Sequence, residues 1–230
     1  MTLKTGLLGG AFNPPHYGHL HPAREAMEAL GLDRVVLIPT GVHPFKGPEI
    51  LAPVAHRLAM VRLAVADWAD FDLWEIEAAS PRVSYTVETL AAWHRHFPDE
   101  EPVLLIGADI SRELHLWREW WRLIELAHVC LMTRPGFSLV PDPERPALDY
   151  LERFRVAAAP DLDRQRLGRY GFFSLPVTQL DIASTELRRR LQTGENLRSL
   201  TPDAVIEHAR AHGLYGCGVD SPSTLGVNLK

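Results

Sequence analysis

Short apolar runs alternate with longer amphipathic stretches along the whole chain. Runs such as VVLIP and VLLIG are apolar at every position, as expected for parallel strands covered by helices on both faces. This alternation is typical of βαβ units and predicts an α/β fold, a Rossmann-like doubly wound parallel sheet with helices on both faces and a small C-terminal helical extension. The expected strands are Thr5–Leu8, Arg34–Pro39, Asp72–Ile76, Val103–Gly107, Val129–Thr133 and Phe172–Val177.

Helices are expected between and after these strands. In the first helix, apolar residues recur every three or four positions up to Leu30, and Gly31 follows as a natural C-terminal residue. In the last helix, Thr201 is the expected N-cap and Pro202 the expected first helical residue. A proline-rich loop over residues 134–145 is expected to lead into a further short helix. The remaining expected helices are Pro53–Asp67, Tyr85–Phe97, Ser111–Leu126, Ser184–Thr193 and Thr201–His212.

Length and composition indicate one globular domain. The 230 residues predict a single domain over residues 1–215, with its helical portion from about residue 184, followed by a flexible tail over 216–230. A net charge of −5 argues against general binding to nucleic acid or to membrane surfaces. The two cysteines are far apart, so neither a disulfide framework nor a zinc site is expected. No apolar run is long enough for a secretory signal or a membrane span, and a cytoplasmic location is expected.

The stretch LLGGAFNPPHYGHLHPA, residues 7–23, carries the first chemical signal. Gly9 and Gly10 end the first strand and allow a ligand to approach the backbone, while a helix starting near Gly18 directs free N–H groups at an anion. The stretch is neither a Walker A loop nor a GxGxxG motif. Instead, His16 and His19 lie three positions apart, so both imidazoles are expected on one face and within reach of one phosphate group.

GGAFNPPHYGH resembles the GGxFxPxHxGH signature of the HxGH nucleotidyltransferases, and more narrowly of the bacterial nicotinate-mononucleotide adenylyltransferases. The resemblance implies that His16 and His19 contact the ATP phosphates and stabilise charge as pyrophosphate leaves. It also implies that Gly9, Gly10 and Phe12 belong to the ATP site. Gly18 is expected there too, because it has no side chain that would block the approach of the phosphate.

A second phosphate-binding segment is expected near the C-terminal end, where DIASTELRRR is similar to the ISSTxIR motif of the same superfamily. Ser184 or Thr185 at a helix start offers a hydroxyl, and Arg188 offers a fork of donors suited to phosphate. An ordinary capped helix with its three arginines in solvent is the alternative interpretation.

The loop PTGVHPFKGPEILAPVAHR resembles the family segment PPHK, which precedes a helix beginning with His-Arg and helps to hold the mononucleotide phosphate. Lys46 and the pair His56–Arg57 match this pattern, whereas His43 and Phe45 stand where the family usually has Pro and His. The resemblance implies that Lys46 binds the mononucleotide, and a solvated loop lysine is the alternative.

SYTVETL matches the family motif SYTxxTL, which implies that Tyr85 and Thr86 lie at the nicotinate side. Without the family, Ser84 is the expected N-cap of a helix. The segment LLIGADISRELHLW places Gly107 and Asp109 at the carboxyl end of a strand, where open α/β sheets bind ligands.

The resemblance implies that Asp109 accepts hydrogen bonds from ribose hydroxyls of both nucleotides and that Trp117 stacks on the nicotinate ring. A purely structural role in the core is the alternative for Trp117. Arg134 matches a family position near adenine.

The resemblance implies transfer of AMP from ATP to nicotinate mononucleotide, giving nicotinate adenine dinucleotide and pyrophosphate in NAD biosynthesis. No protein nucleophile is needed, so catalysis rests on positioning and on electrostatic stabilisation by His16, His19 and Arg188.

Mg2+ is expected as a cofactor held by ATP oxygens and water rather than by a protein metal site, because no carboxylate cluster accompanies these motifs. The nicotinate carboxylate is expected to be bound by backbone or hydroxyl donors rather than by an arginine, which gives a preference for the acid over the amide substrate. The alternatives are an adenylyltransferase acting on phosphopantetheine or nicotinamide mononucleotide, a cytidylyltransferase, and a nucleotide-binding regulator without catalysis. The sequence leaves the oligomeric state open.

Overall fold

The computed structural model describes residues 2–42, 51–133, 144–157, 167–178 and 180–217. Its centre is a six-stranded sheet in the order β3-β2-β1-β4-β5-β6, in which every neighbouring pair is parallel. The expected α/β fold with a doubly wound parallel sheet is therefore confirmed. The strands are β1 (Leu3–Gly10), β2 (Arg34–Pro39), β3 (Phe71–Leu73), β4 (Glu100–Gly107), β5 (His128–Thr133) and β6 (Phe172–Pro176).

Alternate residues of the strands enter two separate cores, one on each face of the sheet. On one face Leu8, Leu105 and Cys130 pack against α1 (Tyr17–Leu30) and α2 (Val54–Val65). On the other face Leu7 and its neighbours pack against α3 (Thr86–His96), α4 (Leu123–Leu126) and α5 (Pro146–Leu151). This two-sided burial explains why runs such as VVLIP in β2 and VLLIG in β4 are apolar at every position.

The first helix ends as expected, because Gly31 adopts the left-handed conformation (φ 61°, ψ 43°) and its N–H donates back into the last turn. Two helix starts differ from expectation. The last helix, α8, runs over Asp203–Ala211 with Pro202 as its N-cap residue, so the expected N-cap Thr201 lies one position outside. Thr201 instead donates its hydroxyl to the carbonyl of Pro15 (2.8 Å). Similarly, Tyr85 rather than Ser84 is the N-cap residue of α3.

The expected continuous helix over Ser111–Leu126 is wrong. The segment forms three short 3₁₀ turns, Ala108–Arg112, Leu114–Leu116 and Trp120–Arg122, before α4 begins. The path is broken at Trp117, which is extended (ψ 142°), and at Glu119, which is left-handed (φ 48°). These bends let Leu114 and Leu123 enter the same core from separate turns, and this tertiary packing overrides the local helical pattern.

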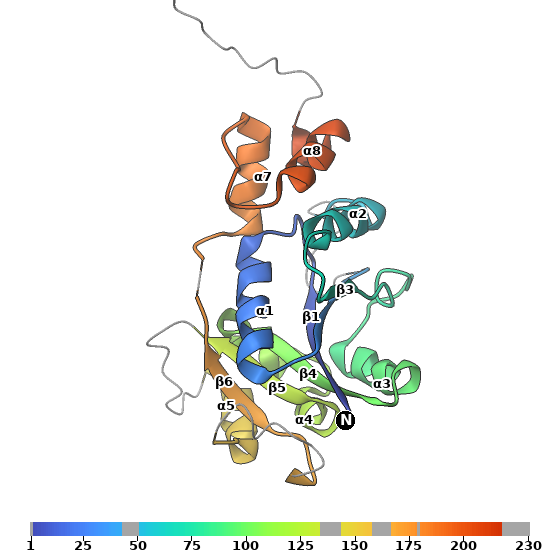
Figure 1. Cartoon of the computed structure of the whole chain (residues 1–230), viewed down its shortest axis with the longest axis vertical. Coiled ribbons are helices and arrows are strands. Elements are labelled where there is room, and N and C mark those ends of the chain that lie inside the picture. Colours follow the sequence, from blue (N-terminus) through green and yellow to red (C-terminus); the bar gives the residue numbers. More distant parts are fainter. Residues whose placement is uncertain (1, 43–50, 134–143, 158–166, 179, 218–230) are drawn as a thin grey trace, which may run out of the picture.

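The C-terminal helical portion begins with α7 (Ser184–Thr193) and continues through α8 to a short turn over Leu214–Gly216. Figure 1 shows α7 and α8 beyond the end of the sheet at which α1 begins, with α2 beside α8. Described structure continues to Cys217, whose buried thiol contacts the carbonyls of Ala209 and Leu214, two residues past the expected domain end. The rest of the expected tail lies outside the described residues.

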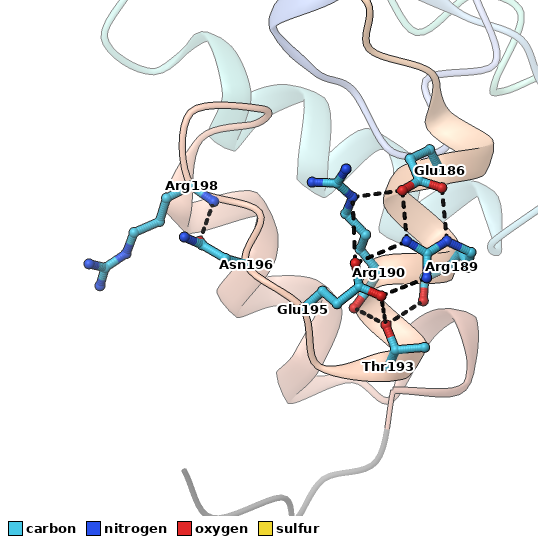
Figure 2. Close-up of polar contacts among 7 residues, drawn as sticks. All are labelled: Glu186, Arg189, Arg190, Thr193, Glu195, Asn196 and Arg198. Carbon is cyan, nitrogen blue, oxygen red and sulfur yellow. Dashed lines mark hydrogen bonds and ion pairs between the residues drawn. The ribbon is translucent and has the colours of Figure 1, made fainter. Parts of the chain in front are cut away.

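Two of the three consecutive arginines of α7 lie on its outer surface. Arg189 pairs with Glu186 (2.8 Å) and with Glu195 (2.6 Å), and Arg190 pairs with Glu186 (2.7 Å), as Figure 2 shows. Exposed pairs of this kind are screened by solvent, so they organise the helix end more than they stabilise the fold. The third arginine, Arg188, takes a different direction. Among the described residues, no helix is long and apolar enough to cross a membrane.

Candidate active site

The candidate site lies at the carboxyl ends of β1 and β4. These two strands are neighbours in the sheet, and the strand order reverses between them, because β2 and β3 lie beyond β1 while β5 and β6 lie beyond β4. Ligands of open α/β sheets bind in the crevice that such a reversal creates. Gly9 and Gly10 end β1 and Gly107 ends β4, so the expected ATP-binding glycines lie at this point.

His16 and His19 lie together at the start of α1, as their spacing predicts. Their ring centroids are 3.7 Å apart with an interplanar angle of 32°. The backbone N–H of His16 donates to Nδ1 of His19 (3.2 Å), which leaves the proton of a neutral His19 ring on Nε2. Nε2 of His19 is therefore the atom that can donate a hydrogen bond to an anion.

His16 is almost completely buried, with 5% of its surface exposed. Burial, and secondarily the neighbouring His19, lowers the pKa of His16 to about 2, so its imidazole is neutral near pH 7. Its Nδ1 atom has no hydrogen-bond partner among the described residues. An unpaired buried nitrogen costs about 1–3 kcal/mol and is uncommon in folded proteins, so this ring is held in place at a cost to stability.

One glycine and the phenylalanine of the motif, Gly18 and Phe12, contact or make room for the histidines. A Cβ atom on Gly18 would lie 2.9 Å from Nδ1 of His16, so Gly18 makes room for that ring and not only for a ligand. Phe12 is 1% exposed and its ring meets the edge of the His19 ring at 5.2 Å. Phe12 therefore supports His19, and only its backbone is placed to contact a nucleotide. A Cβ on Gly9, in contrast, would meet nothing within 4 Å.

The start of α7 lies against the loop that precedes α1. Ser184 donates its hydroxyl to the carbonyl of Pro14 (3.1 Å), and Arg188 donates to the carbonyl of Asn13 (2.9 Å) and to the hydroxyl of Thr185 (3.3 Å). The expected second phosphate segment thus joins the first, although Ser184 and Arg188 use part of their donor capacity to hold the loop. The alternative interpretation, a capped helix with three arginines in solvent, describes Arg189 and Arg190 on the outer surface. It does not describe Arg188, which contacts the loop before α1.

Arg57 has a structural role that the sequence did not reveal. Its guanidinium is 1% exposed and donates to four backbone carbonyls: those of Ala52 (3.0 Å), Ala11 (2.9 Å), Thr40 (2.7 Å) and Gly41 (3.1 Å). These carbonyls belong to the loops that follow β1 and β2 and to the segment before α2. Arg57 therefore fixes the loops around the site. The only signal in the sequence was the match of His56–Arg57 to the family pattern.

Two of the residues expected at the nicotinate side, Tyr85 and Thr86, lie at the start of α3. A cavity of about 310 Å3 is lined by Ser84, Tyr85 and Glu88 together with Arg118, and Thr86 is the first residue of the helix. The Arg118 guanidinium lies 4.8 Å from the centre of the Tyr85 ring and 3.2 Å from a carboxylate oxygen of Glu88. Trp117 is the residue directly before Arg118 and is half-buried against the core. Sequence reasoning missed Arg118, a cation beside the expected carboxylate-binding residues.

Asp109 follows β4 and is exposed. A Cβ on Gly107 would lie 2.5 Å from Oδ1 of Asp109, so Gly107 allows the carboxylate to fold back toward the strand end. In α3, Thr89 donates to the buried carboxylate of Glu77 (2.6 Å), and burial raises the pKa of Glu77 despite this bond and another from Thr40. Sequence reasoning did not single out Glu77. Lys46, Phe45, His43 and Arg134 lie outside the described residues.

Comparison with known proteins places this geometry in a family. A profile described as cytidylyltransferase-like matches residues 7–190. A probable nicotinate-nucleotide adenylyltransferase of Roseiflexus sp. (strain RS-1) is 42% identical over 210 residues, which are 91% of this chain and 96% of that protein. A probable nicotinate-nucleotide adenylyltransferase of Dechloromonas aromatica is 39% identical over 94% of this chain and 99% of that protein. The chain belongs to the nicotinate-nucleotide adenylyltransferase family. The resemblance carried by the GGAFNPPHYGH stretch is thereby confirmed.

Solved structures agree on the fold of this nicotinate-nucleotide adenylyltransferase family member. The nicotinic acid mononucleotide adenylyltransferase of Plasmodium falciparum complexed with NaAD aligns with a TM-score of 0.68, covering 95% of this chain and all of that chain. The same protein complexed with APC aligns equally well. At 14% sequence identity these alignments support the fold alone.

Proposed function

We propose that the protein transfers the adenylyl group of MgATP to nicotinate mononucleotide, giving nicotinate adenine dinucleotide and pyrophosphate. The observation that carries this proposal is the pair of imidazoles, His16 and His19, stacked 3.7 Å apart where β1 leads into α1. Two imidazoles at a helix N-terminus form a site for a phosphate chain, because they add side-chain donors to the free backbone N–H groups. Family membership supplies the acceptor, since the matched relatives are named for nicotinate nucleotides.

The ATP half of the site consists of the loop after β1 and the start of α7. In this proposal Nε2 of His19 donates to a phosphate oxygen, and Arg188, held near by Asn13, adds positive charge. Gly9 and Gly10 let the nucleotide lie against the strand end, while Ser184, Thr185 and the first N–H groups of α7 face the same phosphates. Arg134 and Lys46 remain predictions for adenine and for the mononucleotide phosphate, respectively.

The nicotinate half consists of the start of α3 and the turn that carries Trp117. Tyr85 and Thr86 are proposed to bind the ring carboxylate, and Trp117 to stack on the ring. Asp109, at the end of β4 between the two halves, is proposed to accept hydrogen bonds from ribose hydroxyls. Arg118 lies beside Tyr85 but pairs with the carboxylates of Glu88 and Glu119, so the preference for an anionic ring substituent is assigned to hydroxyl and backbone donors.

The reaction needs no covalent intermediate with the protein. A phosphate oxygen of the mononucleotide attacks the α-phosphorus of ATP in line, the new O–P bond forms, and the bond from the α-phosphorus to the bridging oxygen breaks to release pyrophosphate. The protein aligns the two phosphates and stabilises the charge that develops on the leaving group through His16, His19 and Arg188. Mg2+ is proposed to enter with ATP as part of the substrate, and the described residues of this site include no carboxylate cluster that would hold it separately.

The proposal is tested by measuring pyrophosphate release by the purified protein with MgATP. Parallel reactions contain nicotinate mononucleotide, nicotinamide mononucleotide or phosphopantetheine. We expect fast release with nicotinate mononucleotide and much slower release with the other two.

Each other result points to a different function. Equal release with the acid and the amide would contradict the assigned specificity. Release only with phosphopantetheine would contradict the nicotinate half of the site and leave the ATP half intact. Measurable ATP binding without release in any reaction would indicate a nucleotide-binding regulator.

A further inference from the structure

Three histidines from two distant parts of the chain meet on the surface between α2 and α8. His56 belongs to the first turn of α2, and His208 and His212 lie one turn apart at the end of α8. One ring nitrogen from each histidine can be chosen so that the three atoms all lie within 4.8 Å of one another. Among the described residues, this is the only group of three or more histidine, cysteine or acidic side chains so arranged.

Two of these nitrogens already have the separation of two ligands on one metal ion. Nδ1 of His56 and Nε2 of His208 are 3.2 Å apart. Two nitrogens bound at 2.0–2.1 Å to a tetrahedral ion lie about 3.3–3.4 Å apart, so these rings require almost no movement to share an ion. Without an ion, these two nitrogens share one hydrogen bond.

The third histidine is held in the tautomer that a ligand needs. Nδ1 of His212 lies 2.8 Å from the carbonyl of His208, one turn back on the same helix, and a contact of this kind requires a proton on Nδ1. The lone pair of a neutral His212 ring is then on Nε2. A hydrogen bond from the non-ligating nitrogen to a backbone carbonyl is the usual support of a metal-binding histidine. The centroid of the His212 ring lies 4.2 Å from that of His208 and 4.7 Å from that of His56, so the three rings are already close together.

We propose that His56, His208 and His212 form a binding site for a divalent transition-metal ion, with zinc as the ion that best fits three imidazoles in a tetrahedral arrangement. Water completes the fourth position. The site joins α2 to α8, and the residue after His56 is Arg57, which holds the loops of the active site. The bound ion therefore fastens the C-terminal helical portion to the part of the chain that shapes the ATP site. This inference does not depend on the substrates proposed above.

The test uses the untagged full-length protein, treated with a chelator and then titrated with Zn2+ against a chromophoric competitor at pH 7.5. We expect the wild type to bind one equivalent of Zn2+. His212→Ala should weaken binding at least about 100-fold, because loss of even an outer hydrogen-bond partner of a metal ligand costs 10–100-fold. A second variant, His208→Gln, should show the same loss.

His96→Ala is the matched control. His96 ends α3 as His212 ends α8, is exposed, and has the same contact from Nδ1 to the carbonyl one turn back (2.9 Å). The control should bind Zn2+ as the wild type does. Zn2+ should raise the melting temperature of the wild type and of the control, and it should leave the melting temperatures of His212→Ala and His208→Gln unchanged. Visible absorption of the Co2+ form should show the strong bands of a tetrahedral site.

Two results would overturn the site. One is a wild type that binds no stoichiometric Zn2+. The other is a folded His212→Ala or His208→Gln variant that binds as tightly as the wild type, since the ion would then lie elsewhere.

Discussion

The imidazole of His16 occupies the space into which a side chain on Gly18 would project, with a Cβ atom there lying 2.9 Å from Nδ1 and 3.0 Å from Cε1 of His16. Gly18→Ala is therefore expected to displace the His16 ring. The carbonyl of Ile182 at 3.3 Å limits the alternative paths for the new methyl group. We expect turnover to fall by about 10-fold or more, while the protein stays folded. Initial rates of pyrophosphate release and a thermal melt check this, and unchanged turnover would show that the ring position is unimportant.

Gly9→Ala provides the complementary case. A Cβ at Gly9 meets nothing within 4 Å, and the residue is exposed, so the melting temperature should not fall. Any loss of activity must then come from contact between the new methyl group and ATP, which is expected to lie against the end of β1. We predict a several-fold increase in KM for ATP with little change in turnover. A variant with the wild-type KM would remove Gly9 from the ATP site.

His19→Ala should reduce turnover by about 10²–10³-fold, the usual loss when one donor to the transition state is removed. His21→Ala is the control, because His21 lies half a turn further along α1 and packs against Trp68 and Tyr17 instead. Steady-state kinetics of both variants at saturating substrates test the prediction. Wild-type turnover in His19→Ala would exclude a catalytic role.

The burial of His16 predicts a pH dependence of stability. The folded-state pKa is lowered to about 2, whereas an unfolded histidine titrates near 6.5. As the pH falls below about 6.5, the unfolded chain takes up a proton that the folded chain does not. The free energy of unfolding should therefore fall by up to about 1.4 kcal/mol per pH unit from this residue alone. Urea unfolding at a series of pH values between 7.5 and 5 measures this effect. The free energy of unfolding should fall less steeply with decreasing pH in His16→Gln than in the wild type, and an equal fall in both proteins would contradict the assignment.

Arg57→Ala should destabilise the protein by at least about 3 kcal/mol, since it leaves four backbone carbonyls without their donor and each such loss costs about 1–3 kcal/mol. Arg57→Lys should recover only part of this stability, because an ammonium group lacks the planar fork. Arg95→Ala is the control, since Arg95 is exposed and donates to a single carbonyl (3.0 Å). Urea unfolding of the three variants measures the differences, and a loss no larger than that of the control would refute the anchoring role.

The sequence predicted the central strands well because they are buried on both faces and apolar over most of their length. The edge strand β3 covers Phe71–Leu73 instead of the expected Asp72–Ile76, and it is only partly buried. Arg34–Pro39 matches the expected strand at both ends. The sequence predicted the segment Ser111–Leu126 poorly. The break at Glu119 depends on how Leu114 and Leu123 pack against core residues from distant parts of the chain. Local spacing cannot contain that information.

The same distinction holds for the site. His16 and His19 are neighbours in the chain, and their meeting follows from helical spacing alone. His56 and His208 are separated by 152 positions, and only the packing of α8 on α2 brings them together. Arg57 was visible only as part of a motif, because its partners are backbone carbonyls, which every sequence has.

The side-chain oxygen of Asn13 accepts from the N–H of Ala52 (2.9 Å) and from the hydroxyl of Tyr215 (2.9 Å). The loop that carries the two histidines is thus tied to the middle and to the far end of the chain, and Thr201 adds a bond to the carbonyl of Pro15. On the ribosome, residues 11–16 are made early but their last supports are made late. A nascent chain can form β1 and α1 and still lack the support of this loop until Tyr215 has left the exit tunnel, so the loop is completed late in folding.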